Sequence, residues 1–195
     1  MFDLGGVFFE DGTKKFLNKL SSKTDKSLEE LHPLFREGKS LEYRKNKITG
    51  IEFFKWAASE LGNSISPEEL NLMWVSEYVE RPQIRDIIKS LKEKGIKITI
   101  LSDNVPERIK YLQNKYHFLE LFDDVVLSYQ VNLIKDSPEM FNLALSRIKV
   151  NPNESIFIDD KQEKLDIANR LAINTLLFTN TDLLQTQLNN IISNS

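Results

Sequence analysis

The sequence predicts an α/β fold with a Rossmann-like parallel sheet core flanked by helices and a small all-helical cap inserted after the first strand. From residue 81 onward, short apolar runs rich in β-branched residues alternate with helical patterns, which is typical of βαβ units. Residues 13–78 show helical periodicity throughout and no convincing strand. We therefore expect a core formed by residues 1–12 and 79–195 and a helical cap formed by residues 13–78.

Four runs after residue 81 are nearly continuous in apolar residues, as expected for strands that helices cover on both faces. They are residues 96–101, 124–127, 155–158 and 175–178. We expect helices over residues 82–94, 106–116, 138–149, 162–171 and 182–192, followed by a frayed tail. Gly95 lies where a helix C-terminal cap is expected, and Ser137 before Pro138 is a candidate N-cap.

Residues 13–78 contain two helix-start signals. Thr49 with Glu52, and Ser66 with Glu69, have the spacing of a capping box. Aromatic residues at helical spacing follow both signals, and we expect them to pack together as the interior of this segment. They are Phe53, Phe54, Trp56 and Trp74.

Composition limits the classes of function. The 195 residues are 41% hydrophobic and 28% charged, and the net charge of −3 disfavours nucleic-acid binding. The absence of cysteine excludes disulfides and thiolate nucleophiles. No apolar run approaches the roughly 20 residues of a membrane helix. We expect a soluble, cytoplasmic protein with a small-molecule substrate and no nucleic-acid or membrane partner, and the sequence does not indicate an oligomeric state.

Polar residues stand at the ends of the predicted strands, where doubly wound sheets bind their ligands. Asp3 ends a first strand, Ser102 follows the next, Lys135 precedes a helix, and Asp159 and Asp160 follow another strand. A carboxylate can attack phosphorus, a hydroxyl and a lysine can neutralise phosphate oxygens, and paired acids can hold a hard cation. Together these residue types predict phosphoryl transfer.

Each of these residues also has an ordinary structural interpretation. Asp159 and Asp160 could cap a helix, as could Ser102, and Lys135 could be a solvated loop residue. Arg44 belongs to a charged run that is typical of a solvated face, with a smaller prospect of reaching a substrate. His32 and His117 have no paired ligands nearby and are expected to be surface or packing residues.

The segments FDLGGVFFEDG, KITILSDN, LIKDSPEMF and SIFIDD resemble, in this order, the four motifs of the haloacid dehalogenase (HAD) superfamily. The resemblance covers nearly the whole chain. It implies that Asp3 is the nucleophile, and that Ser102 and Lys135 hold the phosphate with help from the backbone of Asp103.

The same resemblance implies a magnesium site. Asp3, the Gly5 carbonyl and Asp160 would be ligands, and Asp159 would orient a metal-bound water. Mg²⁺ suits such a set because it prefers oxygen ligands and keeps several waters.

The insertion resembles the small helical cap of subfamily IA, in the branch of glucose-1-phosphatases and of the phosphatase domain of epoxide hydrolases. The segment that carries this likeness is FREGKSLEYRKNKITGIEFFKWAASELG. A cap of this kind would close over the site and contact the leaving group. The resemblance therefore predicts a Mg²⁺-dependent phosphatase that hydrolyses a small phosphomonoester, such as a sugar phosphate, through an aspartyl-phosphate.

Two departures from the family pattern leave alternatives open. Gly5 replaces the second aspartate that most of these phosphatases use as general acid and base, which is worth about a hundredfold to ten-thousandfold in rate. Only Met1 and Phe2 precede Asp3, whereas a strand usually needs about five or six residues, so we expect the first strand to lack its beginning. The alternatives are a catalytically silent phosphate-binding or regulatory protein, and a dehalogenase that needs no metal, against which the Asp159 and Asp160 pair argues.

Overall fold

A parallel sheet forms the centre of the molecule. The computed structural model describes residues 1–193, so part of the tail that we expected to fray lies outside the described residues. Strand β1 is parallel to β2 and β3 is parallel to β4, which confirms the predicted α/β class. The strands are β1 (Thr99–Ser102), β2 (Asp124–Leu127), β3 (Ile156–Asp159) and β4 (Asn174–Leu177).

The N-terminal segment lies between β1 and β3 and joins the two strand pairs. Phe2 forms parallel bridges to Ile100 and to Ile158. Its N–H donates to the Thr99 carbonyl at 2.8 Å, and the Asp3 N–H donates to the Ile158 carbonyl at 3.0 Å. This pairing on both sides places Asp3 in the middle of the sheet, at the carboxyl ends of its neighbours. That the first strand lacks its beginning stays a prediction.

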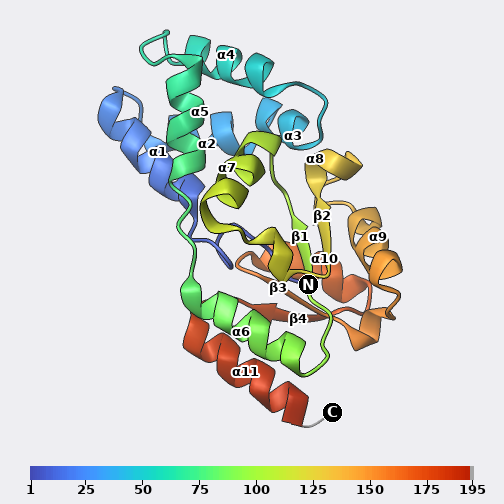
Figure 1. The fold of residues 1–195 in the computed structure, drawn as a ribbon. Helices are drawn as coiled ribbons and strands as arrows, with labels where there is room; N and C mark the ends of the chain where they lie inside the picture. The colour runs from blue at the N-terminus through green and yellow to red at the C-terminus, as the bar shows by residue number, and fades with distance from the viewer. Residues whose placement is uncertain (194–195) are drawn as a thin grey trace.

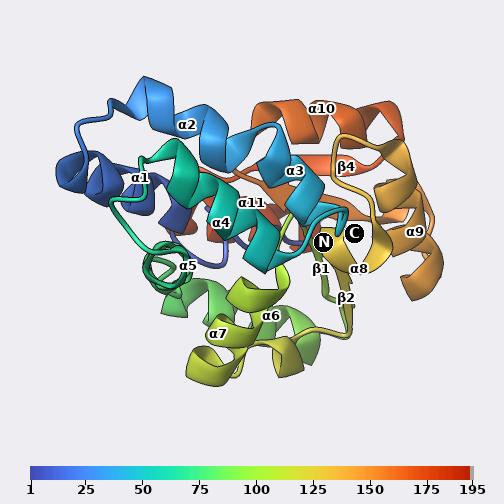
Figure 2. The ribbon, with the colours of Figure 1, turned by 90° about the horizontal axis from the view of Figure 1, so that it is seen from above.

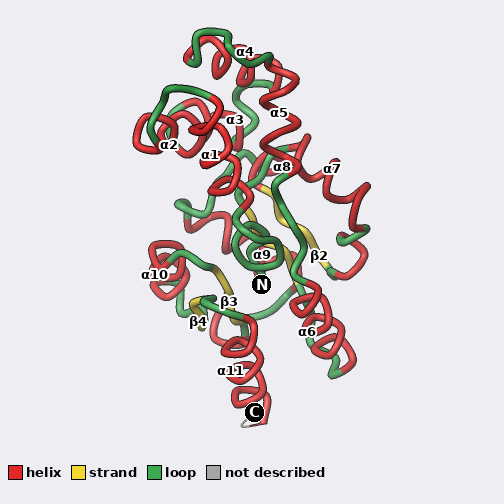
Figure 3. The backbone as a smooth tube through the Cα atoms, turned by 90° about the vertical axis from the view of Figure 1, so that its left-hand side faces the viewer, coloured by secondary structure: helices red, strands yellow, loops and turns green. Residues whose placement is uncertain are grey.

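Helices cover both faces of this sheet, and Figures 2 and 3 show α6 and α10 on opposite sides of the strands. Ile100 and Ile158 share one hydrophobic cluster with α6, α7 and α11, whereas Leu101 and Phe157 share another with α9 and α10. Successive residues of a strand point to opposite faces, so apolar runs without alternation supply both clusters. The helices are α6 (Pro82–Glu93), α7 (Pro106–Tyr116), α9 (Pro138–Ile148), α10 (Gln162–Arg170) and α11 (Thr181–Ser193). Short elements complete this part: η1 (Leu119–Leu121), α8 (Ser128–Val131) and η2 (Pro152–Glu154).

Five further helices gather beyond the end of the strands at which β1 leads into α7 (Figure 1). They are α1 (Gly12–Lys23), α2 (Leu28–Arg36), α3 (Lys39–Arg44), α4 (Gly50–Glu60) and α5 (Pro67–Ser76). They enclose a hydrophobic cluster of their own, in which Phe53, Phe54 and Trp74 are buried and Trp56 is partly buried. The predicted helical character and aromatic interior of this segment are thus confirmed, while its division from the core at residues 13 and 78 stays a prediction.

The predicted start signals act largely as expected. Thr49 and Glu52 form a complete capping box at α4, and the Ser66 side chain accepts from the Glu69 N–H at α5. Gly95 has a φ of 77° directly after α6, a conformation in which glycine is unstrained.

Some predicted boundaries were wrong. Strand β1 begins at Thr99 instead of residue 96, because the Asp123 side chain accepts from the Ile98 N–H, and it includes Ser102. Strands β3 and β4 each lie one residue away from the prediction, and Asp159 ends β3. Helices α6, α9 and α10 end one residue earlier than predicted, and α11 covers Thr181–Ser193. Ser137 precedes α9 but does not cap it, since its hydroxyl binds the Glu139 carboxylate.

None of the described helices is both long and apolar enough to cross a lipid bilayer.

Candidate active site

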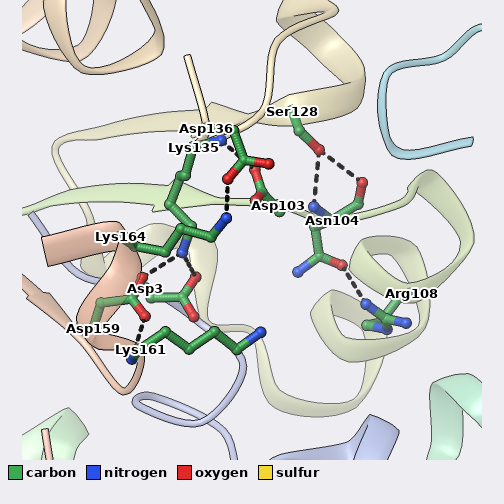
Figure 4. Close-up of polar contacts among 10 residues, drawn as sticks. All are labelled: Asp3, Asp103, Asn104, Arg108, Ser128, Lys135, Asp136, Asp159, Lys161 and Lys164. Atoms are coloured by element: carbon green, nitrogen blue, oxygen red, sulfur yellow. Dashed lines mark hydrogen bonds and ion pairs between the residues drawn. The ribbon is translucent and has the colours of Figure 1, made fainter. Parts of the chain in front are cut away.

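The fold brings the predicted polar residues together at the carboxyl end of the sheet (Figure 4). Lys135 is central, because its ammonium lies 2.8 Å from Asp3 Oδ1 and 2.6 Å from Asp159 Oδ2. Asp3 lies in the N-terminal segment and Asp159 at the end of the adjacent β3, and Lys135 reaches both from the loop between α8 and α9. The solvated-loop interpretation of Lys135 is therefore wrong.

Lys135 carries its charge inside the protein. Only 4% of its surface is exposed. Burial alone lowers the pKa of Lys135, but the carboxylates of Asp159 and Asp3 raise it above its ordinary value. The group is a permanent cation at neutral pH, which suits the neutralisation of an anionic ligand.

The Asp3 carboxylate is held from two sides. Burial raises the pKa of Asp3 above its ordinary value, although the Lys135 charge and hydrogen bonds from Lys135 and Ser102 oppose this shift. Ser102 is 1% exposed at the end of β1. A buried carboxylate that bears hydrogen bonds from a hydroxyl and an ammonium is fixed in orientation, as a nucleophile requires.

The two adjacent aspartates differ in their partners. Both oxygens of Asp159 are engaged, Oδ2 by Lys135 and Oδ1 by the Lys161 N–H at 2.9 Å. Asp160 Oδ1 is buried and has no hydrogen-bond partner. Burial, followed by the charges of Asp3 and Asp159, raises the pKa of Asp160 to about 7. A buried carboxylate oxygen without a partner is costly unless a cation meets it.

These acids fit a hard cation. One carboxylate oxygen each of Asp3, Asp159 and Asp160 lies within 4.8 Å of the others. Since Asp159 is already occupied by hydrogen bonds, Asp3 and Asp160 are the carboxylates best placed to be ligands. Three acids beside a single lysine carry more negative than positive charge, which suits the binding of Mg²⁺.

The loop after Asp3 depends on Gly6. Its φ is 98°, and a Cβ added there would lie 2.3 Å from the Asp160 carboxylate. Only glycine permits this backbone conformation together with such a close approach. Sequence reasoning missed Gly6, because the contact joins the first loop to the end of β3.

Asp103 takes part through its side chain as well. Its carboxylate accepts from the Lys135 N–H at 2.9 Å, and burial raises its pKa. This bond fixes the start of the loop that carries Lys135. The predicted contact between the Asp103 backbone and a phosphate stays a prediction.

Comparison with known families identifies the protein class. A model of the haloacid dehalogenase-like hydrolases matches residues 2–172, a span that includes every residue of the site described above. The chain belongs to this family. The resemblance seen in the four motifs is thereby confirmed.

The hydrolase is also similar to individual proteins. It is 28% identical over 166 residues to Bifunctional epoxide hydrolase 2 of Mus musculus, a match that covers 75% of this chain and 29% of that protein. It is 25% identical over 186 residues to D-ribitol-5-phosphate phosphatase of Bacteroides thetaiotaomicron, covering 90% of this chain and 88% of that protein. The chain therefore spans less than a third of the epoxide hydrolase and most of the ribitol-phosphate phosphatase.

Solved structures share the fold of this hydrolase. A HAD family enzyme from Bacteroides thetaiotaomicron, in complex with magnesium and inorganic phosphate, superimposes with a TM-score of 0.76 at 24% identity. The match covers 91% of this chain and 92% of that one. A HAD-like family hydrolase from Porphyromonas gingivalis gives a TM-score of 0.78 at 22% identity, covering 96% and 95%.

In this hydrolase the space beside Gly5 is occupied by Tyr78. A Cβ at Gly5 would lie 3.3 Å from Tyr78 Cε1, and the φ of Gly5 is not positive. The glycine therefore gives room to the aromatic ring of the segment that returns from α5. The role of the Gly5 carbonyl as a metal ligand stays a prediction.

A cavity of about 450 Å³ opens above Asp3, and residues of α1, α2, α3, α7 and α10 contribute to its wall. Arg36 lines it and pairs with Asp11 at 2.8 Å. Arg44 also lines it and is buried, so the interpretation of Arg44 as a solvated residue is wrong. The sequence did not predict a role for Asp11, Arg36 and Arg108. Each stands in a local pattern of charged residues that is typical of a solvated helix face.

Proposed function

We propose that this hydrolase is a Mg²⁺-dependent phosphatase of small phosphomonoesters, and that Asp3 forms an aspartyl-phosphate. The observation that carries the proposal is the Asp3 carboxylate, held by the buried Lys135 ammonium at 2.8 Å beneath a cavity of about 450 Å³. A sugar or polyol phosphate is the substrate class to try first, since the chain is similar over most of its length to a ribitol-phosphate phosphatase.

The reaction has two displacements at phosphorus. A carboxylate oxygen of Asp3 forms a bond to phosphorus while the bond to the alcohol oxygen breaks, and the alcohol leaves with the electron pair and takes a proton from water. A second water then attacks phosphorus and gives a proton to the hydroxide left by the first water. The bond between phosphorus and the Asp3 oxygen breaks, so Asp3 regains its carboxylate and inorganic phosphate is released. Lys135 and Ser102 face the same carboxylate and would neutralise the phosphoryl oxygens in both steps.

Asp3 and Asp160 would hold the magnesium ion, together with the Gly5 carbonyl. When bound, the metal supplies positive charge to the phosphate oxygens. Asp159 would keep Lys135 in place and orient water near the site. The magnesium and inorganic phosphate bound by the similar HAD family enzyme support a magnesium-dependent reaction at phosphate.

Helices α1–α5 would serve as the cap of residues 13–78, since α1, α2 and α3 line the cavity above Asp3 and share one hydrophobic cluster with α4 and α5. Gly5 supplies no acid, so protonation of the departing alcohol depends on water. We therefore expect esters of acidic alcohols to be hydrolysed faster than those of ordinary alcohols.

The test is the Asp3→Asn variant. An amide has nearly the same shape but is a far poorer nucleophile, so hydrolysis of p-nitrophenyl phosphate with Mg²⁺ should fall at least about a thousandfold. Lys135 keeps its partner Asp159 in this variant, so the melting temperature should change little. Asp86→Asn, an exposed change on α6, is the matched control. Near-native turnover by a folded Asp3→Asn protein would disprove the covalent mechanism.

A further inference from the structure

Arg108 on α7 is a buried cation with unused hydrogen-bond donors. It is 2% exposed and lines the cavity above Asp3. Its Nη1 donates to Asn104 Oδ1 at 3.3 Å, whereas Nε and Nη2 have no hydrogen-bond partner. Nε and Nη2 form one edge of the guanidinium, which is the edge that binds a carboxylate or a phosphate through two parallel bonds.

Two aromatic rings fix the guanidinium in place. Its central carbon lies 4.1 Å from the ring centroid of Trp74 and 4.4 Å from that of Tyr78. The rings are tied together, because Trp74 Nε1 donates to the Thr13 hydroxyl at 3.0 Å and that hydroxyl bonds to the Tyr78 hydroxyl at 2.6 Å. Tyr78 in turn packs on Gly12, where a Cβ would lie 2.2 Å from the ring. Arg108 is thus held rigidly, although the rings accept no bond from its free edge.

No carboxylate of the described chain neutralises this charge by an ion pair with Arg108. The nearby Asp11 pairs with Arg36, and Glu107 accepts a hydrogen bond from Tyr43. Burying a cation whose Nε and Nη2 have no acceptor costs folding free energy. A bound anion would supply both the acceptors and the opposite charge. Arg44, the other buried arginine of the cavity, is satisfied by Ser40 and by the Phe35 carbonyl. Arg36 also lines the cavity and has an unbonded Nε, but its charge is paired with Asp11. Among the described arginines of the cavity, Arg108 alone combines an unpaired charge with two unbonded nitrogens on one edge.

We propose that Arg108 binds a second anionic group, a carboxylate or a second phosphate, on the alcohol part of the substrate. The inference rests on the proposed phosphatase function and narrows its substrate class. Figure 4 shows Arg108 on the far side of Asn104 from Asp3 and Lys135. A group bound there belongs to the leaving part of the ester, because Asp3, Ser102 and Lys135 surround the reacting phosphate.

Binding to the Asp3→Asn protein tests the proposal without turnover. Calorimetry with Mg²⁺ would compare three pairs of ligands that differ by one anionic group: 3-phosphoglycerate with glycerol 3-phosphate, 6-phosphogluconate with glucitol 6-phosphate, and fructose 1,6-bisphosphate with fructose 6-phosphate. In at least one pair, the ligand with the extra anion should bind at least about tenfold more tightly. The first two pairs report a carboxylate and the third a second phosphate.

Adding Arg108→Gln to the same background should reduce this ratio to less than about threefold, and Arg108→Lys should leave an intermediate ratio because it keeps the charge but loses the fork. Arg170→Gln, an exposed change in the last turn of α10, is the control and should keep the full ratio. Ratios below about threefold in all three pairs with Arg108 intact would overturn the proposal. An unchanged ratio in a folded Arg108→Gln protein would also overturn it.

Turnover of p-nitrophenyl phosphate by the wild-type protein is measured separately and reports on the phosphatase function. A protein that shows the binding ratio without turnover would retain the Arg108 site and lose the proposed reaction. A protein that shows turnover without the binding ratio would retain the proposed reaction and lose the Arg108 site.

Discussion

At the scale of single residues, the site is governed by how each carboxylate is paired. Asp159 has both oxygens bonded, and Asp3 is held by Lys135 and Ser102. Asp160 alone of these three has a buried oxygen with no hydrogen-bond partner. The hydrogen-bond partners therefore distinguish three aspartates that the sequence alone does not: Asp159 is occupied by its bonds, whereas Asp160 has an oxygen available for a ligand.

Replacing Asp160 should therefore weaken magnesium binding more than it weakens the fold. In Asp160→Asn, we expect the Mg²⁺ concentration for half-maximal phosphatase rate to rise at least about tenfold, because an anionic ligand is lost. Asp166→Asn on α10 removes an exposed carboxylate and should leave that concentration unchanged. An unaltered magnesium titration of Asp160→Asn would show that another acid holds the metal.

The pKa of Asp160 predicts how magnesium binding depends on pH. Burial and its acidic neighbours raise this pKa to about 7, so protons compete with the metal below neutral pH. The Mg²⁺ concentration for half-saturation should rise about tenfold as the pH falls from 8 to 6, and Asp160→Asn should lose most of this dependence. Calorimetric titrations at both values check the slope, and a flat profile in the wild-type protein would contradict it.

At the scale of elements, the loop between Asp3 and α1 is built around Gly6. This loop must turn sharply so that its backbone passes the end of β3, and the φ of 98° at Gly6 allows it. The Asp160 side chain fills the space beside that glycine. The loop that contains Gly6 and Asp160, which directly follows β3, therefore pack closely, and a larger side chain at Gly6 would displace the Asp160 carboxylate.

Two glycine substitutions separate backbone strain from this fit. Gly6→Ala and Gly62→Ala both place a side chain at positive φ, which costs about 1–3 kcal/mol of folding free energy. Only at Gly6 does the new Cβ collide with Asp160, since nothing lies within 4 Å at Gly62. We expect urea unfolding to show a loss in both variants, and magnesium-dependent turnover to fall in Gly6→Ala alone. Equal turnover in the two variants would refute a fitted loop.

At the scale of the whole molecule, α3, α4 and α5 meet α7 next to the site. Trp74 of α5 contacts Arg108, and the Tyr43 hydroxyl of α3 donates to the Glu107 carboxylate. Gly50 leaves room for this pair, because a Cβ there would lie 2.3 Å from Glu107 Oε1. These contacts determine how the two parts of the molecule meet.

Tyr43→Phe tests that interface. The variant keeps the ring among Phe53, Phe54 and Trp74 but leaves the half-buried Glu107 without its donor. We expect a loss of about 1.5–3 kcal/mol in unfolding free energy, the range for a hydrogen bond to a charged group. Tyr111→Phe, also on the half-buried side of α7, should stay within about 0.5 kcal/mol. No difference between the two variants would mean that the bond contributes nothing to the joining of the parts.

The sequence by itself determined the fold class, the helical nature of residues 13–78 and the meeting of Asp3, Ser102, Lys135, Asp159 and Asp160. Buried parallel strands read as apolar runs, and residues at their carboxyl ends converge at one edge of the sheet, so chain order suffices to predict the site. Strand limits were less certain, as at β1, because a side chain such as Asp123 can replace the backbone partner of Ile98.

Only the tertiary structure decided what surrounds that site. Arg108 has the spacing of an ordinary helix residue, and its burial depends on Thr13, Trp74 and Tyr78, which lie far from it along the chain. The fit of Gly6 to Asp160 likewise joins segments more than 150 residues apart. Local patterns specify helices and strands because their forces act over a few residues, whereas the environment of a buried charge depends on how distant elements pack.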